Sequence, residues 1–185
     1  MIDPSHETLA LRAATPADVP ALVDLVTRCY RGDASRVGWT TEADLLDGNR
    51  IDPDILRNDI ARPFSQVLVA EREGNLLACA HVCREGDAGY FGMFSVDPEL
   101  QRAGLGSHLL SRCEWIAATE WQLSMMRMTV IEQRAELIAY YQRRGYRRTG
   151  IFKPFPYGDP RFGLPRRDDL RFEVLEKELQ PEAVA

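Results

Sequence analysis

The chain has 185 residues, of which 45% are hydrophobic and 28% are charged, and its net charge is −5. This balance is typical of a folded water-soluble protein and excludes intrinsic disorder, collagen and coiled coil as descriptions of the whole chain. Because there is no net basic charge to attract nucleic acid or an anionic membrane surface, we expect neither as a partner.

The first half of the chain predicts a strand, a long helix and a hairpin. A strand at 9–13 precedes Thr15 and Pro16, which begin an amphipathic helix to about Arg31. Residues 32–41 read as a loop, 42–46 as a short helix, and Asp52 opens another short helix. Two strands, 66–71 and 76–83, are joined by Glu73-Gly74-Asn75, a typical hairpin turn.

The second half alternates strands with helices. Strands are predicted at 90–96 and 126–131, and helices begin near Gly104 and at Ala135, the latter ending before Gly145. Strands at 146–152 and 170–175 complete an α/β domain with a mixed sheet, spanning 9–179 between flexible ends at 1–8 and 180–185. The connection 153–169 is long and rich in aromatic residues, including Phe155, so we expect a packed wall or a functional segment.

Nothing in the sequence indicates export or membrane insertion. Its apolar stretches, such as 76–80, are far below the ~20 residues of a membrane-spanning helix. The start Met-Ile-Asp-Pro lacks the basic and apolar regions of a secretory signal. The four cysteines have no disulfide-framework spacing. We therefore predict reduced cysteines in the core of a cytoplasmic protein.

The segment 94–107 carries the clearest chemical signal. It predicts a strand, a turn, and then Gly104 and Gly106 at the start of a helix. Free amides at a helix N-terminus bind anions, and glycines let the backbone approach phosphate oxygens closely. The lysine of a P-loop is absent, since His108 follows Ser107, and Leu109 stands where a dinucleotide fingerprint needs a small residue. Alone, the glycines are also compatible with a simple tight turn.

A second motif gives the first one a context. Gln101-x-x-Gly104-x-Gly106, followed downstream by Tyr141-Gln-Arg-Arg-Gly145-Tyr146, resembles the two signatures of the GNAT superfamily of acetyl-CoA-dependent N-acetyltransferases. The resemblance covers residues 9–179. It implies a three-layer fold with a central mixed, mostly antiparallel twisted sheet and helices on both faces. It also implies acetyl-CoA as acetyl donor, no metal, and a primary amine of a small molecule or peptide as acceptor.

The resemblance also implies roles for individual residues. Tyr141 is the expected general acid, which protonates the departing thiolate. The pantetheine arm is expected along the strand edge formed by Phe94, Ser95 and Val96. The pyrophosphate is expected on the loop and helix start formed by Gln101, Arg102, Ala103, Gly104, Leu105, Gly106 and Ser107.

One position departs from the family pattern. Many members carry asparagine seven residues before the tyrosine, where this chain has Arg134. Arg134 is expected to meet a cofactor phosphate or an acidic acceptor, or to lie solvated at the helix start. Glu132 is the first candidate for the base that takes the proton of the amine, with Glu42 and Asp44 as alternatives. The residues expected at the acceptor site are Tyr30, Trp39, Glu42 and Phe155.

Two other functions are compatible with these residues. The first is a catalytically silent acyl-CoA-binding or regulatory domain of the same fold, and the second is an interaction domain whose glycines form only a turn. Cys79, His81 and Cys83 share one strand face, but the outer two lie about 13 Å apart at ~3.3 Å per residue, too far for one zinc ion. We predict no metal site. A homodimer paired through sheet edges is left open, as is the identity of the acceptor.

Overall fold

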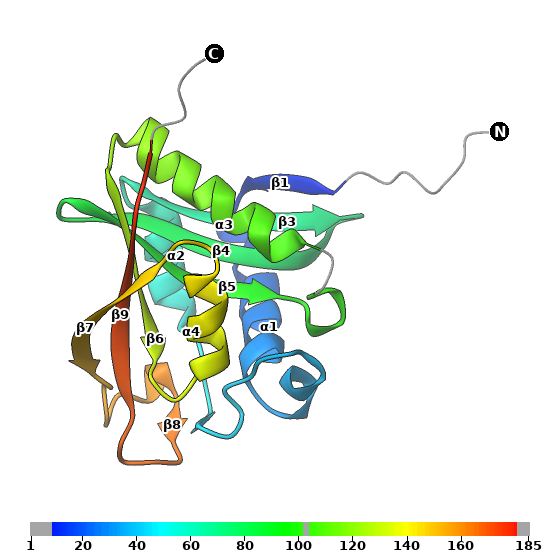
Figure 1. Ribbon diagram of the computed structural model, residues 1–185. Helices are drawn as coiled ribbons and strands as arrows, with labels where there is room; N and C mark the ends of the chain where they lie inside the picture. Colours follow the sequence, from blue (N-terminus) through cyan, green and yellow to red (C-terminus); the bar gives the residue numbers. More distant parts are fainter. Residues whose placement is uncertain (1–8, 102–103, 181–185) are drawn as a thin grey trace.

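The computed structural model describes residues 9–101 and 104–180 (Figure 1). Its strands are Ala10–Ala13 (β1), Leu46–Asp47 (β2), Ser65–Arg72 (β3), Asn75–Glu85 (β4), Ala88–Val96 (β5), Met125–Ile131 (β6), Arg147–Pro154 (β7), Leu164–Pro165 (β8) and Arg171–Glu178 (β9). Its α-helices are Val19–Tyr30 (α1), Pro53–Ala61 (α2), Leu105–Trp115 (α3) and Ala135–Gln142 (α4). Short 3-10 turns lie at Pro16–Asp18 (η1), Asp33–Val37 (η2), Pro98–Leu100 (η3) and Pro160–Phe162 (η5), and a π turn at Ile116–Glu120 (η4) extends α3.

Seven strands form one sheet in the order β1-β3-β4-β5-β6-β9-β7. Each neighbouring pair is antiparallel except β5 and β6, which run parallel. The two short strands β2 and β8 pair separately. Strand β9, the last in the sequence, lies between β6 and β7 and is therefore an interior strand of the sheet.

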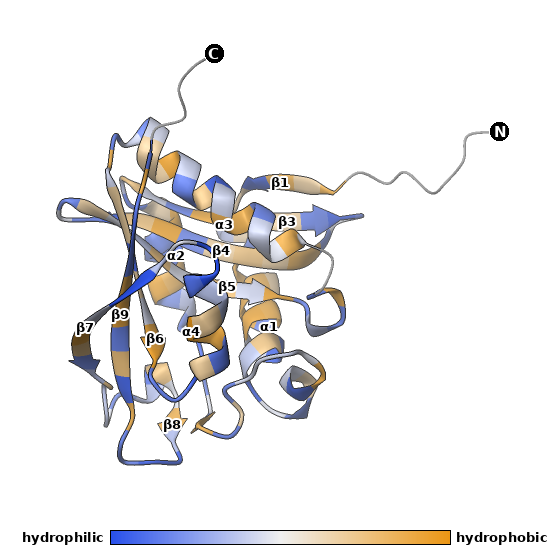
Figure 2. Cartoon of the chain, in the orientation of Figure 1, coloured by the Kyte–Doolittle hydropathy of each residue, from blue (hydrophilic) through white to orange (hydrophobic). Residues whose placement is uncertain are grey.

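The two faces of the sheet support separate hydrophobic cores. In β3, Val67 and Val69 pack with α1 and α2 on one face, whereas Leu68 and Ala70 pack with α3 and α4 on the other. Successive side chains of a strand point to opposite faces, which explains this division. Figure 1 shows α3 crossing in front of β3 and β4, and Figure 2 shows apolar segments along the strands and the helices that cover them. The predicted three-layer arrangement is therefore confirmed.

The sheet opens between β5 and β6. β5 pairs with β4 from Ala88 to Val96 with an interruption at Met93 and Phe94, but with β6 only at Gly89 and Tyr90. Met93 has a φ of 49°, and the register between β4 and β5 shifts there. Such a bulge bends a strand and increases its twist. The end of β5, from Met93 to Val96, consequently leaves β6 and presents a free edge.

Several predictions that rest on a few neighbouring residues are confirmed. The hairpin between β3 and β4 turns at Glu73 and Gly74, which both have positive φ, as a two-residue hairpin turn requires. All four cysteines are buried and free, as predicted. The predicted loop 32–41 contains η2.

The predicted short helix at 42–46 is wrong. The amides of Leu45 and Leu46 both donate to the carbonyl of Glu42, at 2.8 and 2.9 Å, and form a single turn. Leu46 then enters β2, where it is buried and pairs with Pro165 of β8. The partner strand lies more than a hundred residues further along the chain, so local sequence could not reveal it.

Within residues 9–101 and 104–180, no helix is long and apolar enough to cross a membrane. The same part of the chain contains no cluster of three or more His, Cys, Asp or Glu side chains that could hold a metal ion. The ends predicted to be flexible, 1–8 and 180–185, lie outside the described residues except for Gln180.

Candidate active site

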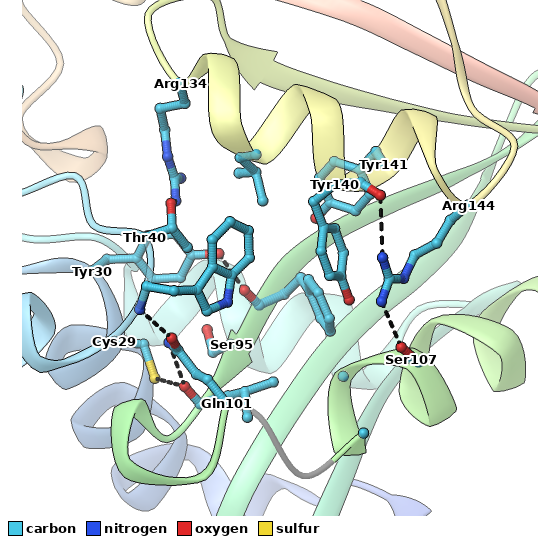
Figure 3. A pocket seen from close by; sticks show the side chains of 16 residues that line it. Cys29, Tyr30, Thr40, Ser95, Gln101, Ser107, Arg134, Tyr140, Tyr141 and Arg144 are labelled. Carbon is cyan, nitrogen blue, oxygen red and sulfur yellow. Dashed lines mark hydrogen bonds between the residues drawn. The ribbon is translucent and has the colours of Figure 1, made fainter.

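Two cavities meet where β5 separates from β6. The first cavity, of about 210 Å³, lies between the end of β5, the start of α3 and helix α4 (Figure 3). The second cavity, of about 260 Å³, lies between β5, β6 and the aromatic residues of the connection after β7. The residues that line both cavities are Tyr30, Phe94, Arg134, Leu137 and Tyr141.

The N-terminus of α3 forms one wall of the first cavity. Gly104, just before the helix, has a φ of 79°, and a Cβ there would meet no atom within 4 Å. Gly106 is enclosed instead, because a Cβ there would lie 2.8 Å from Cζ of Phe94. The first amides of a helix have no partner within it, and the helix dipole adds positive potential there. This wall therefore suits an anionic group such as a phosphate.

Arg144 adds a positive charge to the same wall. Its Nη2 donates to Oγ of Ser107 at 2.8 Å, and its guanidinium lies 3.5 Å from the centre of the Tyr140 ring. Figure 3 shows Arg144 reaching from the end of α4 toward the start of α3. Among the described residues, the charged side chains lining the first cavity are Arg144 and Arg134, both cations.

The free edge of β5 forms the floor between the cavities. β5 pairs with β4 at Ser95 and Val96, and no strand of the described chain pairs with it on the other side beyond Tyr90. The carbonyl of Phe94 accepts a hydrogen bond from the hydroxyl of Tyr30. The carbonyl of Val96 accepts from Sγ of Cys29 at 3.2 Å. This edge can receive an extended amide-bearing chain as an added strand.

Gln101 and Trp39 hold the loop beside the first cavity. Oε1 of Gln101 accepts from the backbone amide of Trp39 at 2.9 Å, and its Nε2 donates to the carbonyl of Val96 at 3.3 Å. The Trp39 ring lies 5.3 Å from the Tyr140 ring. Trp39 therefore lines the first cavity, although the sequence suggested the acceptor site for it. The side chain of Gln101 bonds within the protein rather than pointing to the amides of α3.

Tyr141 lies at the junction of the two cavities and is buried. Burial, together with the neighbouring Tyr30, raises the pKa of its hydroxyl well above the ordinary value. The group is therefore protonated at neutral pH and can donate its proton. Its ring packs against Phe91, Phe94 and Tyr146, which fix its direction.

Glu42 sits at the centre of an arginine cluster. Its Oε2 accepts from Nη1 of Arg31 at 2.7 Å, and its Oε1 accepts from Nη1 of Arg134 at 2.8 Å. Arg50 follows at 3.5 Å. Burial alone would raise the pKa of Glu42, but Arg50, Arg134 and Arg31 together hold it below the ordinary value. Glu42 is therefore a poor proton acceptor at neutral pH.

Arg134 is buried rather than solvated, with only 8% of its side chain exposed. Besides Glu42, it donates to Oγ1 of Thr40 at 2.9 Å (Figure 3). The solvated alternative considered for this arginine is thus excluded. Arg134 lines both cavities. Its predicted contact with a cofactor phosphate or with an acidic acceptor therefore stays a prediction.

Some of the other predicted residues line the two cavities and others do not. Glu132 lines neither cavity and forms a two-point ion pair with Arg171, which lowers the pKa of Glu132. Phe155 is buried and lines the second cavity, and Leu105, the first residue of α3, is also buried. Arg102 and Ala103 lie outside the described residues.

Sequence reasoning missed three residues of the site. In the sequence, Arg144 belongs to a run of arginines near a helix end, a pattern typical of a solvated face, although it follows Tyr140 by four residues and so shares its helix face. Arg31 and Arg50 carried no signal, because their partner Glu42 lies in a segment without clear periodicity. Only the folded chain places them together.

Residues 63–148 match the family model of the acetyltransferase (GNAT) domain. The chain is 30% identical over 97 residues to an amino-acid acetyltransferase of Pseudomonas putida. That stretch covers 51% of this chain and 21% of the relative, so the chain spans only a minor part of the relative's length.

Solved structures show the same fold at low sequence identity. A ribosomal-protein-S18-alanine N-acetyltransferase from Escherichia coli has a TM-score of 0.65 at 15% identity, covering 96% of this chain and 97% of the other. A PaiA N-acetyltransferase from Thermoplasma acidophilum, in complex with coenzyme A, has a TM-score of 0.66 at 14% identity, covering 92% and 99%.

Proposed function

We propose that this chain is an acetyltransferase of the GNAT superfamily, which transfers an acetyl group from acetyl-CoA to a primary amine of a small molecule or peptide. The observation that carries the proposal is the position of Tyr141, a buried phenol shared by two cavities. A transfer between two substrates needs such a meeting point. The first cavity is assigned to the coenzyme and the second to the amine.

The residues of the first cavity fit coenzyme A. The amides of α3 and the side chain of Arg144 would hold the pyrophosphate, where Gly104 leaves open space. The free edge of β5 at Phe94 and Val96 would hold the pantetheine arm, and its amides can donate to the thioester carbonyl. When bound, acetyl-CoA supplies an activated acyl group that the amine attacks directly.

Protons are handled by residues at the junction. Tyr141 holds its proton at neutral pH, so it can give it to the departing sulfur as general acid. The positive arginine cluster lowers the pKa of an ammonium in the second cavity, which increases the neutral fraction that can attack. Water or Glu132 would take the released proton, and the ion pair with Arg171 makes Glu132 the weaker candidate.

Two measurements test the proposal. Coenzyme A should raise the melting temperature, because a ligand at a hundredfold its dissociation constant adds about 2.7 kcal/mol of stability. Acetyl-CoA with a panel of amines should release free thiol, and Tyr141→Phe should reduce kcat by roughly 10²-fold or more without changing coenzyme A affinity.

Tyr146→Phe is the matched control, since Tyr146 is buried in the same aromatic cluster but lines neither cavity. Coenzyme A binding without thiol release from any amine would favour the catalytically silent binding domain. Full activity of Tyr141→Phe would refute the assignment of the general acid.

A further inference from the structure

The second cavity has an excess of positive charge. Within the described chain, its charged lining residues are Glu42 and three arginines, Arg31, Arg50 and Arg134, which leaves a net charge of +2. The remaining walls are largely apolar and include Phe91, Met128, Val130, Ile131, Phe155 and Phe172. An apolar cavity that holds a few convergent charged groups is typical of a site for a small polar ligand.

The single negative charge of Glu42 is already engaged by two of the three arginines. Each of its two oxygens accepts from a different buried arginine, Arg31 and Arg134, whose side chains are only 6% and 8% exposed. Both arginines also keep a buried Nε without a hydrogen-bond partner. A buried cation is costly unless it is paired and hydrogen-bonded, so the cluster favours a further anion.

Arg50 is the arginine most available to that anion. Its side chain is 29% exposed, and its single ion pair within the described residues is the 3.5 Å contact with Glu42. The guanidinium lies over the Tyr30 ring, 4.5 Å from its centre. Nε of Arg50 faces Glu42, and stacking on a ring face lets the Nη donors at the guanidinium edge form a two-point contact with a planar anion.

We infer that the acceptor amine also carries a carboxylate, which Arg50 binds at the edge of the cluster formed with Arg31 and Arg134. The inference rests on the proposed function, since that function makes the second cavity the acceptor site. A carboxylate matches the fork of an arginine better than a neutral amide does, and it would offset the excess charge.

Tyr30 connects this cluster to the transfer point. One face of its ring carries Arg50, and its hydroxyl bonds the carbonyl of Phe94 at the free edge of β5. The carboxylate and the reacting end of the acceptor would therefore be about one tyrosine side chain apart. A cavity of about 260 Å³ with this spacing suits a small amino acid rather than a long polyamine.

Binding of acids and amides that lack an amine tests the inference without turnover. Isothermal calorimetry would use 4-methylpentanoate and 3-phenylpropanoate, each beside its carboxamide, with the protein saturated with coenzyme A. The wild-type protein should bind each acid at least about tenfold more tightly than its amide. Arg50→Gln should remove this preference, whereas Arg50→Lys should keep part of it because the charge remains.

Arg57→Gln is the matched control, because Arg57 is an exposed arginine of α2 that lines neither cavity and pairs with Asp54. Equal affinity for acid and amide in the wild type, an unchanged preference in Arg50→Gln, or no binding of either acid up to its solubility limit would overturn the inference. The proposed function is judged separately by thiol release from a panel of amines with and without a carboxylate. Release from amines that lack a carboxylate would show that the function holds and only the inference is wrong.

Discussion

Replacing Glu42 by glutamine should strongly destabilise the fold. The substitution removes the negative charge from between two side chains that are 6% and 8% exposed, Arg31 and Arg134. Removing one partner of a buried ion pair costs about 3–5 kcal/mol, because the remaining charge stays buried and uncompensated. At about 2–4 °C per kcal/mol for a domain of this size, the melting temperature should fall by roughly 6–20 °C.

The pH dependence of this effect has a defined sign. The pKa of Glu42 in the folded protein lies below its ordinary value of 4.5. Its contribution is therefore fully present above that value and is lost as the pH falls through the lower, folded-state pKa. The stability difference between wild type and Glu42→Gln should be constant near neutral pH and shrink in acid.

Urea unfolding followed by circular dichroism would measure the difference at several pH values. Asp44→Asn, an exposed carboxylate two residues away that pairs with Arg36, should leave the melting temperature nearly unchanged. The double variant Glu42→Gln with Arg134→Met should recover part of the loss, because it also removes a buried cation. A loss below about 1 kcal/mol in Glu42→Gln, or no recovery in the double variant, would refute this account of the cluster.

Three further predictions concern the first cavity and the thiols. Arg144→Gln should weaken coenzyme A binding roughly 10- to 100-fold in calorimetry, because a charge-assisted contact is lost, while the exposed neighbour Arg143→Gln should not; equal effects would contradict the role of Arg144. Gly106→Val should abolish coenzyme A binding, because its Cβ would lie 2.8 Å from Phe94. The control His108→Ala, on the exposed side of α3, should bind normally. Retained binding by the valine variant would argue against the start of α3 as the coenzyme-binding wall. Burial raises the pKa of Cys29 and Cys79 to about 12, so the folded protein should not react with a disulfide reagent at pH 8 until guanidinium unfolds it, and rapid native labelling would disprove their burial.

Much of the site was predictable because its signal lies in short segments. Gly104 and Gly106 mark a strand-to-helix turn, and Tyr141 lies a fixed number of residues before Gly145. In each case the relevant backbone geometry is determined by residues a few positions apart, so sequence spacing translates directly into spatial position. The order of most helices and strands followed from the same local periodicities.

The parts that could not be predicted depend on contacts between distant segments. β9 inserts between β6 and β7, and the 42–46 segment enters β2 because β8 is there to pair with it. Hydrogen-bonded pairing of this kind is decided by which strand edges become adjacent, and no local pattern records it. Glu132 was a candidate base because it follows a strand, but this local position gave no sign of its ion pair with the distant Arg171.

The amino-acid sequence by itself thus determined where a glycine-flanked helix start and a tyrosine would lie, because backbone conformation and helix spacing are local properties. Only the tertiary structure decided that Arg134 would meet Glu42, 92 residues away, together with Arg31 and Arg50. The reason is that the charge of a cavity is a sum over side chains from several segments. That sum is defined only in the folded chain, where β5 separates from β6 and the lining residues of the second cavity come together.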